Sequence, residues 1–162
     1  MNALIAERIK PVMALAIAVP SSSTPDYVSL KNVTRLSILI TILNGSTVTG
    51  SAITLKQATA VAATGEKALA FSTMWANTDC AAGDDFTKTT VTSDTFTTDT
   101  TNAKILQYII EVDPTDLDMD NGFDCVRLGA GNTANTLLFS ATYHCEMKTM
   151  AAVADLADVT SD

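Results

Sequence analysis

Apolar and polar side chains alternate along several stretches of this chain. In residues 33–43 the apolar side chains Leu36, Ile38, Ile40 and Ile42 occupy every second position. Successive side chains of a β-strand point to opposite faces of its sheet, so this pattern predicts a strand with one fully apolar face. The segments KILQYIIEV (residues 104–112) and TLLFSATYHCEM (residues 136–147) predict two further strands in the same way.

Turn-forming residues divide the rest of the chain into shorter strands. We expect these at residues 12–19, 27–30, 47–59, 68–75, 86–91, 95–98 and 125–128. The pair Asn44-Gly45 predicts a hairpin, because both residues tolerate positive φ, and Gly50 predicts a bulge. Strands at short intervals without intervening helical patterns predict an all-β fold, namely an antiparallel β-sandwich with about the strand number of a jelly roll.

Helical patterns occur only near the two ends of the chain. Leu4, Ile5 and Ile9 have helical spacing, which predicts a short helix over residues 2–10 that ends at Pro11. We expect one β-sandwich domain over residues 1–148, followed by a short helical or mobile acidic tail over residues 149–162. The predicted core includes Leu36, Ile38, Ile40, Ile42, Leu106, Tyr108, Ile110 and Leu138.

The apolar segment VMALAIAV (residues 12–19) follows Arg8 and Lys10, as in a secretory signal. Glu7 and Pro11 do not fit that pattern, and the segment is far shorter than the ~20 residues that span a bilayer. We therefore expect a buried strand here and no association with a membrane.

Composition narrows the range of functions. The chain has 162 residues, a net charge of −8 and only 17% charged residues. Nucleic-acid-binding surfaces need clustered Lys and Arg, so direct binding to nucleic acid is not expected. The 25 threonines include nine in residues 87–101, a composition that favours extended strands with threonine ladders over a catalytic loop.

Candidate reactive groups are few. Cys80, Cys125 and Cys145 lack the spacing of a zinc site, and a Cys125–Cys145 disulfide remains an alternative to reduced, buried thiols. The single histidine, His144, precedes Cys145 in a predicted strand, where the two side chains point to opposite faces and cannot form a dyad. We expect no catalytic residue and no cofactor.

Two short motifs resemble ligand-binding loops. Asp116, Asp118 and Asp120 alternate as at the start of a calcium loop, but Asn121 and Arg127 occupy positions where that motif needs Gly and Glu. We expect an Asp-rich turn there and no metal, with a weak divalent-cation site as the alternative. The segment 129–131, Gly-Ala-Gly, precedes a strand and so predicts a turn and not a phosphate-binding loop.

Residues that could contact a partner protein lie in three segments. Residues 1–10 are either a packed cap or an arm that reaches a neighbour, and Trp75 is either a core residue or part of a contact patch. Exposed parts of the threonine-rich segment are a third candidate. The predicted contact residues are Leu4, Ile5, Arg8, Trp75, Thr97 and Thr98.

Three long segments carry a resemblance to a known group of proteins. They are IAERIKPVMALAIAVPSSSTPDYVSLKN, TVTGSAITLKQATAVAATGEKALAF and TVTSDTFTTDTTNAKILQYIIEVDPTDLDMDNGFDCVRLG. The chain, up to about Met147, resembles small auxiliary virion proteins encoded among the head genes of tailed bacteriophages. That resemblance implies a capsid cement or decoration protein, in some members with a jelly-roll fold, and it carries over no catalytic residue.

We therefore expect a structural protein on the surface of an icosahedral capsid. Its expected partners are the major capsid protein and further copies of this chain in a small homo-oligomer. One alternative is a head-completion, connector or tail-component protein that forms a ring at the portal vertex. An enzyme or a glycan-binding module is a third possibility.

Overall fold

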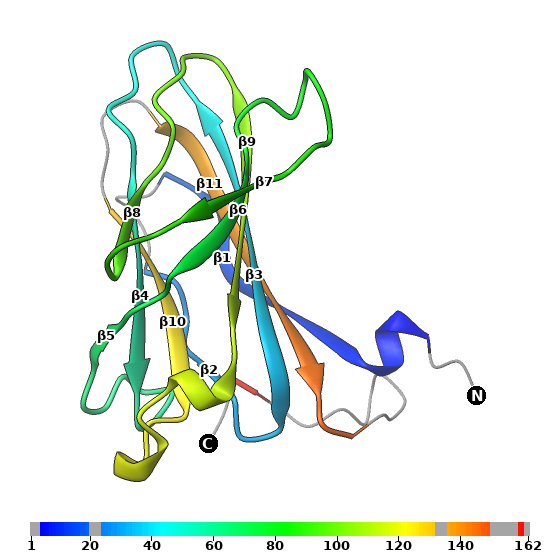
Figure 1. Ribbon diagram of the computed structural model, residues 1–162, viewed down its shortest axis with the longest axis vertical. Coiled ribbons are helices and arrows are strands. Elements are labelled where there is room, and N and C mark those ends of the chain that lie inside the picture. Colours follow the sequence, from blue (N-terminus) through cyan, green and yellow to red (C-terminus); the bar gives the residue numbers. More distant parts are fainter. Residues whose placement is uncertain (1–3, 20–23, 132–135, 150–158, 161–162) are drawn as a thin grey trace.

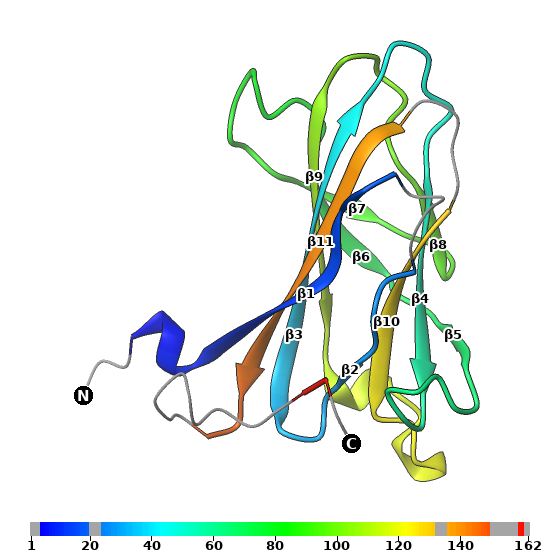
Figure 2. The ribbon, with the colours of Figure 1, turned by 180° about the vertical axis from the view of Figure 1, so that it is seen from behind.

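The computed structural model describes residues 4–19, 24–131, 136–149 and 159–160, and the side chains of residues 136 and 137 lie outside that description. Two antiparallel sheets pack face to face (Figures 1 and 2). The six-stranded sheet has the order β1 (Ile9–Ala18), β11 (Thr136–Met147), β3 (Val33–Asn44), β9 (Ile105–Val112), β6 (Thr73–Asn77) and β7 (Thr87–Thr90). The five-stranded sheet has the order β2 (Val28–Ser29), β10 (Cys125–Ala130), β4 (Ala52–Ala58) and β5 (Lys67–Leu69), and β8 (Thr95–Thr97) also pairs with β4. The predicted all-β sandwich is confirmed.

The strand order is that of a jelly roll with an insertion. The first and last strands, β1 and β11, are neighbours, and the chain then alternates so that β1-β11-β3-β9 form one sheet and β2-β10-β4-β5 the other. Strands β6, β7 and β8 lie between β5 and β9 in sequence, and they extend the two sheets along one side of the sandwich. The threonine-rich segment therefore belongs to this insertion.

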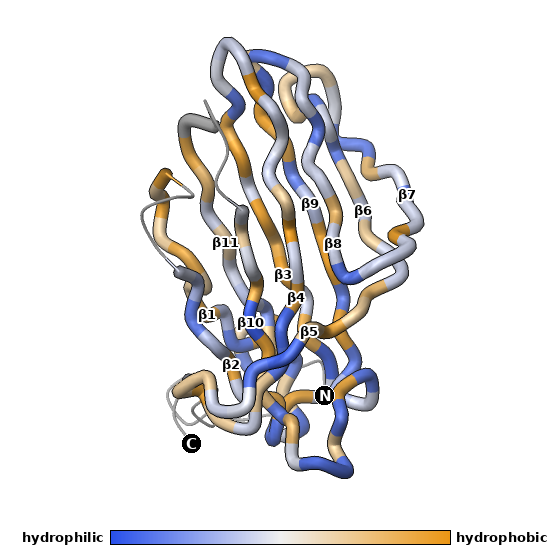
Figure 3. Tube along the Cα trace, turned by 90° about the vertical axis from the view of Figure 1, so that its left-hand side faces the viewer, coloured by the Kyte–Doolittle hydropathy of each residue, from blue (hydrophilic) through white to orange (hydrophobic). Residues whose placement is uncertain are grey.

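The core lies between the sheets and is supplied by alternate residues of the long strands. Figure 3 shows that hydrophobic residues are frequent along these strands. The predicted core residues Leu36, Ile38, Ile40, Ile42, Leu106, Tyr108 and Ile110 are all buried. Leu138 is the exception, with 42% of its surface exposed. Its neighbour Phe139 faces inward opposite Ile42, and alternation along β11 therefore leaves Leu138 opposite Leu43 on the outer face.

The predicted hairpin at Asn44-Gly45 is wrong. β3 already pairs with β11 and β9 along its two edges, so the following strand, β4, must join the other sheet. Asn44 is buried, and its side-chain amide donates to the carbonyl oxygens of Asp99 and Thr101. The asparagine thus ties two loops together where the chain changes sheets.

Two other elements differ from the prediction: one expected strand is divided into two, and another strand is longer than expected. The strand expected at residues 68–75 is two strands, β5 and β6, which belong to different sheets, and residues 70–72 cross between them. The turn expected at residues 129–131 is absent at its first two positions, because Gly129 and Ala130 continue β10.

The predicted helix over residues 2–10 is also wrong. Of the described residues in this segment, Ile5–Glu7 form a 3-10 turn (η1), and β1 begins at Ile9. Pro11 is accommodated because β1 is an edge strand, where a missing N–H costs no ladder hydrogen bond. The expectation of a buried strand holds only in part, since Ala14 and Leu15 are buried while Met13 and Ile17 are exposed.

The C-terminal region contributes to the core. Val159 is buried in the main hydrophobic cluster, and its carbonyl oxygen accepts a hydrogen bond from the Ser29 N–H of β2. The short helical or mobile tail expected over residues 149–162 lies almost wholly outside the described residues. Helical turns are not confined to the ends, because Pro114–Asp116 (η3) and Met119–Asn121 (η4) form 3-10 turns in the Asp-rich loop.

Candidate functional site

The outer face of the six-stranded sheet carries a row of side chains across five strands, and all but one of them are apolar. In ladder register the row contains Met13 of β1, Thr142 of β11, Leu39 of β3, Ile109 of β9 and Trp75 of β6. Met13 is 64% exposed and Trp75 is 38% exposed. Alternate residues of these strands fill the core, so this row faces solvent.

A second apolar row crosses the same face toward the other end of the sheet. Leu138, Leu43 and Ile105 are direct cross-strand neighbours on β11, β3 and β9. Together with Ile17 they line a shallow pocket of about 180 Å³. We call the outward side chains of β1, β11, β3, β9 and β6 the outer face.

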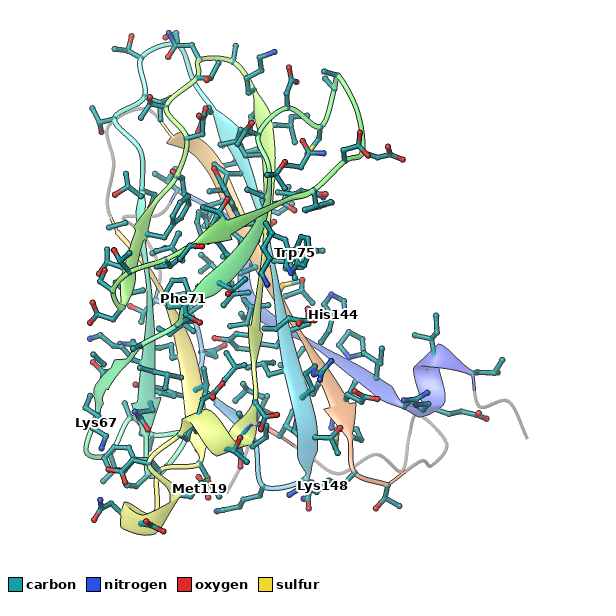
Figure 4. All side chains as sticks on the ribbon, viewed as in Figure 1. Lys67, Phe71, Trp75, Met119, His144 and Lys148 are labelled. Carbon is teal, nitrogen blue, oxygen red and sulfur yellow. The ribbon has the colours of Figure 1, made fainter. Side chains whose placement is uncertain are left out.

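Polar residues separate and flank these apolar rows. Ser140, Thr41 and Gln107 lie between them in register. His144 belongs to a further outward row, and Figure 4 shows His144 and Trp75 on the same side of the sheet. Cys145 points inward and is buried, so the expected separation of His144 and Cys145 on opposite faces is confirmed.

The N-terminal segment forms an arm at one end of this face. Figures 1 and 2 show η1 and the start of β1 extending sideways from the body of the sandwich. Leu4 and Ile5 at its tip are 69% and 77% exposed. The arm is held to β11 because Arg8 forms an ion pair with Glu146, and the Met147 N–H donates to the Arg8 carbonyl oxygen. We call residues 4–8 the arm.

The predicted contact residues are spread over the molecule. Leu4, Ile5 and Arg8 lie on the arm before β1, whereas Trp75 lies on the outer face of β6, four strands away from β1 in the sheet order. Thr97 is exposed on β8 of the other sheet. Thr98 is buried, and its hydroxyl oxygen accepts the Ser51 N–H, so it is not available for contact with a partner.

The sequence did not identify the exposed apolar residues Met13, Ile17, Ile105 and Leu138 as a surface. Both faces of the corresponding strands are largely apolar, so the pattern alone cannot tell which face is buried. A search for strands with two apolar faces would have found them, since a strand of this kind in a two-layer fold covers either a second layer or a partner.

Two of the described thiols have a raised pKa. Burial raises the pKa of the Cys145 thiol to about 12. Burial also raises the pKa of Cys80, whereas a nucleophilic thiol needs a lowered value. Cys125 and Cys145 lie on strands of different sheets and do not form a disulfide with each other.

The Asp-rich loop uses its carboxylates for internal contacts. Asp118 forms an ion pair with Lys67 and accepts hydrogen bonds from the Asn121 amide, and these contacts lower the pKa of Asp118. Asp116 accepts the N–H of Asp113. Within the residues that the structure describes, no three His, Cys, Asp or Glu side chains gather in a way that could hold a metal ion.

A polar cluster lies on the other sheet. Glu66 accepts a hydrogen bond from the Tyr27 hydroxyl at 2.7 Å and forms ion pairs with Lys56 and Arg127. The Lys56 hydrogen bond is the main reason that the pKa of Glu66 is lowered. The cluster joins β4, β10 and the loop before β5, which indicates a structural role.

Comparisons with protein-family models, curated proteins and solved structures found no match for this chain. None of the helical segments in the described ranges has the length and apolar character needed to cross a bilayer.

Proposed function

We propose that this protein decorates or cements the icosahedral capsid of a tailed bacteriophage by bridging capsid subunits, and that it performs no chemistry. The observation that carries the proposal is the position of the exposed apolar residues. Nine large apolar side chains are exposed among the described residues, and seven of them lie on the arm or the outer face: Leu4, Ile5, Met13, Ile17, Trp75, Ile105 and Leu138.

Exposed apolar residues gathered on one face mark an interaction surface more often than a solvated one. The arm leads directly into β1, which is an edge strand of the sheet that carries the outer face, so a single molecule presents this face together with a projecting end. Such a shape allows contact with two neighbouring subunits at once. Many weak contacts of this kind stabilise a shell, because each bound copy adds binding free energy to the assembled state only.

The resemblance to phage head proteins supports the capsid as the partner. The jelly-roll order agrees with it at the level of fold, since jelly rolls are used in capsid and lectin domains. The net charge of −8 supports a position away from the packaged DNA.

Copy number in purified virions tests the proposal. Quantitative mass spectrometry should find this protein at a number comparable to that of the capsid subunits. About six or twelve copies at one vertex would instead assign it to a ring at the portal, because a ring has closed cyclic symmetry.

Binding of variants to isolated capsids tests the surface. The double variant Met13→Glu/Ile17→Glu should keep its melting temperature and lose capsid binding by about tenfold or more, because charge is depleted in the core of an interface. Leu4→Asp/Ile5→Asp should do the same. Met119→Glu is the matched control, since Met119 is 52% exposed but lies outside the outer face. If all these variants bind capsids as tightly as the parent protein, the arm and the outer face are not the capsid-binding surface.

A further inference from the structure

A groove of about 600 Å³ opens beside Trp75, where the insertion joins the jelly roll. One wall is the end of β9, and the other is the segment that leads from β5 into β6 and β7. Apolar side chains of both sheets line it: Leu55, Leu69, Phe71, Val91 and Val112. Its volume lies within the ~300–1,000 Å³ range typical of ligand sites.

The β6–β9 ladder is open at this groove. Its pairs run from Asn77–Gln107 to Trp75–Ile109 and stop there. In this register the next hydrogen-bonding pair, two residues further along each strand, would be Thr73–Glu111, and both of these residues line the groove. β6 has turned away toward the other sheet at this point.

The direction of the backbone groups follows from neighbouring hydrogen bonds. The Ile105 carbonyl accepts the N–H of Cys80 on the β6 side, whereas the Lys104 carbonyl accepts the N–H of Asn44 on the β3 side. Because these directions alternate along a strand, the N–H and C=O of Glu111 point into the groove.

The same reasoning applies to β6. The Ser72 carbonyl accepts the N–H of Val91 on the β7 side, so the backbone groups of Thr73 point toward β9. Thr73 and Glu111 are not partners in the β6–β9 ladder, which ends at Trp75 and Ile109. The groove is therefore bordered by the ends of two strands that have separated from each other.

The two walls of the groove carry charged side chains of opposite sign at the rim. Glu111 and Asp116 stand at the β9 wall, and both are exposed. Lys88 stands at the opposite wall, where its ammonium lies 5.9 Å from the centre of the Trp75 ring. A cation is therefore favoured at the β9 wall and disfavoured near Lys88.

We propose that this groove binds an extended peptide segment of a partner protein, with the pattern apolar–basic–apolar, which pairs with β9 at Glu111. In such a pair, the residue opposite Glu111 has its side chain on the same face as Glu111, where a basic group meets the two carboxylates. Its two neighbours point the other way, toward the apolar floor. This is strand addition, in which main-chain hydrogen bonds give affinity and alternate side chains give specificity.

The proposal does not depend on a capsid as the partner, so synthetic peptides can test it alone. The probe is the fluorescein-labelled peptide Thr-Val-Arg-Val-Thr with blocked ends, and binding to the full chain is measured by fluorescence anisotropy. It should bind at least about tenfold more tightly than the same peptide with Glu in place of Arg. A version with an N-methylated Arg should also lose about tenfold, because it cannot donate to the Glu111 carbonyl oxygen.

Protein variants locate the site. Glu111→Gln/Asp116→Asn should weaken binding of the Arg peptide about tenfold, and Ser72→Trp should abolish it by filling the groove. Asp84→Asn/Asp85→Asn is the matched control, because these exposed carboxylates lie in the loop between β6 and β7. Each variant is first shown to keep the melting temperature of the parent.

Three outcomes would overturn the proposal. The first is that the Arg peptide does not bind. The second is that the N-methylated peptide binds as tightly as the Arg peptide. The third is that the Asp84→Asn/Asp85→Asn control loses as much affinity as Glu111→Gln/Asp116→Asn. A fourth would reassign the groove to sugars: binding of maltohexaose or chitohexaose that Trp75→Ala removes, without any response to the peptides.

Discussion

Gly129 illustrates how closely two strands approach in this sandwich. It lies in β10 directly opposite Thr54 of β4. A Cβ atom added to Gly129 would lie 2.2 Å from the Thr54 hydroxyl oxygen. The backbone of Gly129 does not require glycine, since its φ lies outside the left-handed region. The side chain of Thr54 therefore imposes the requirement.

A double-mutant cycle at this pair gives the first prediction. Gly129→Ala alone should destabilise the protein by about 1–3 kcal/mol through overpacking. In a Thr54→Ala background the same change should be neutral or stabilising, because glycine costs about 0.5–1 kcal/mol relative to alanine within a strand. Urea denaturation of the four proteins measures the cycle.

Gly83→Ala serves as its control, since a Cβ there meets no atom within 4 Å. That change should alter stability by no more than about 0.5 kcal/mol. A penalty for Gly129→Ala that is the same in both backgrounds would show that Thr54 is not the cause.

At the scale of elements, the short strand β2 depends on the C-terminal region. β2 has two residues and pairs with β10 on one side. On the other side, the Ser29 N–H donates to the Val159 carbonyl oxygen at 2.7 Å, and the Val159 side chain is 1% exposed. Residue 159 thus covers an edge that would otherwise be open to other chains.

Substitution of Val159 gives the second prediction. Val159→Ala should lower the free energy of unfolding by about 2 kcal/mol through loss of buried methyl groups, and Val159→Asp should lower it further. Ile17→Ala is the matched control, because Ile17 is 71% exposed and its truncation should change stability by less than about 0.5 kcal/mol.

Thermal and urea unfolding measure the effects of these substitutions. A Val159→Ala effect no larger than that of Ile17→Ala would contradict the packing of this residue in the core.

At the scale of the whole molecule, the tyrosines are built into the sandwich. The Tyr143 hydroxyl donates to the Asp26 carbonyl oxygen and accepts the Leu128 N–H, while the Tyr108 hydroxyl accepts the Asp99 N–H. Burial raises the pKa of Tyr108 to about 12, and it raises the pKa of Tyr143 as well. An unfolded tyrosine titrates near 10.

Alkaline unfolding is the third prediction. Above pH 10 the folded state retains phenol protons that the unfolded chain releases. The contribution of the buried, protonated tyrosines to the free energy of unfolding is therefore fully present below pH 10 and is lost as the pH rises toward 12. The free energy of unfolding should fall by about 1.4 kcal/mol per pH unit for each such tyrosine. Tyrosinate absorbance should therefore appear together with loss of the fold.

Parallel circular dichroism and absorbance titrations between pH 8 and 12 check this behaviour. Gradual formation of tyrosinate near pH 10 with the fold intact would show that Tyr108 and Tyr143 are accessible to solvent.

The amino-acid sequence by itself determined the strands and much of the core. The alternation around Leu36–Ile42 and around Leu106–Ile110 indicates which residues share a face. The side chains of a strand repeat with a period of two, and this period does not depend on the neighbouring strands. The threonine-rich segment likewise gave β7 and β8 at nearly the expected positions. These are local properties, set by side-chain spacing and backbone preference.

Only the tertiary structure decided how the strands are distributed between the sheets. Asn44-Gly45 carries a hairpin signal, yet β3 has both edges occupied by β11 and β9, so the next strand must cross to the other sheet. The outer face and the open ladder at Thr73 and Glu111 depend on the same choice of partners. Strand pairing depends on contacts between residues that are far apart in the chain. A local sequence pattern therefore contains no information about which edge of a strand remains free.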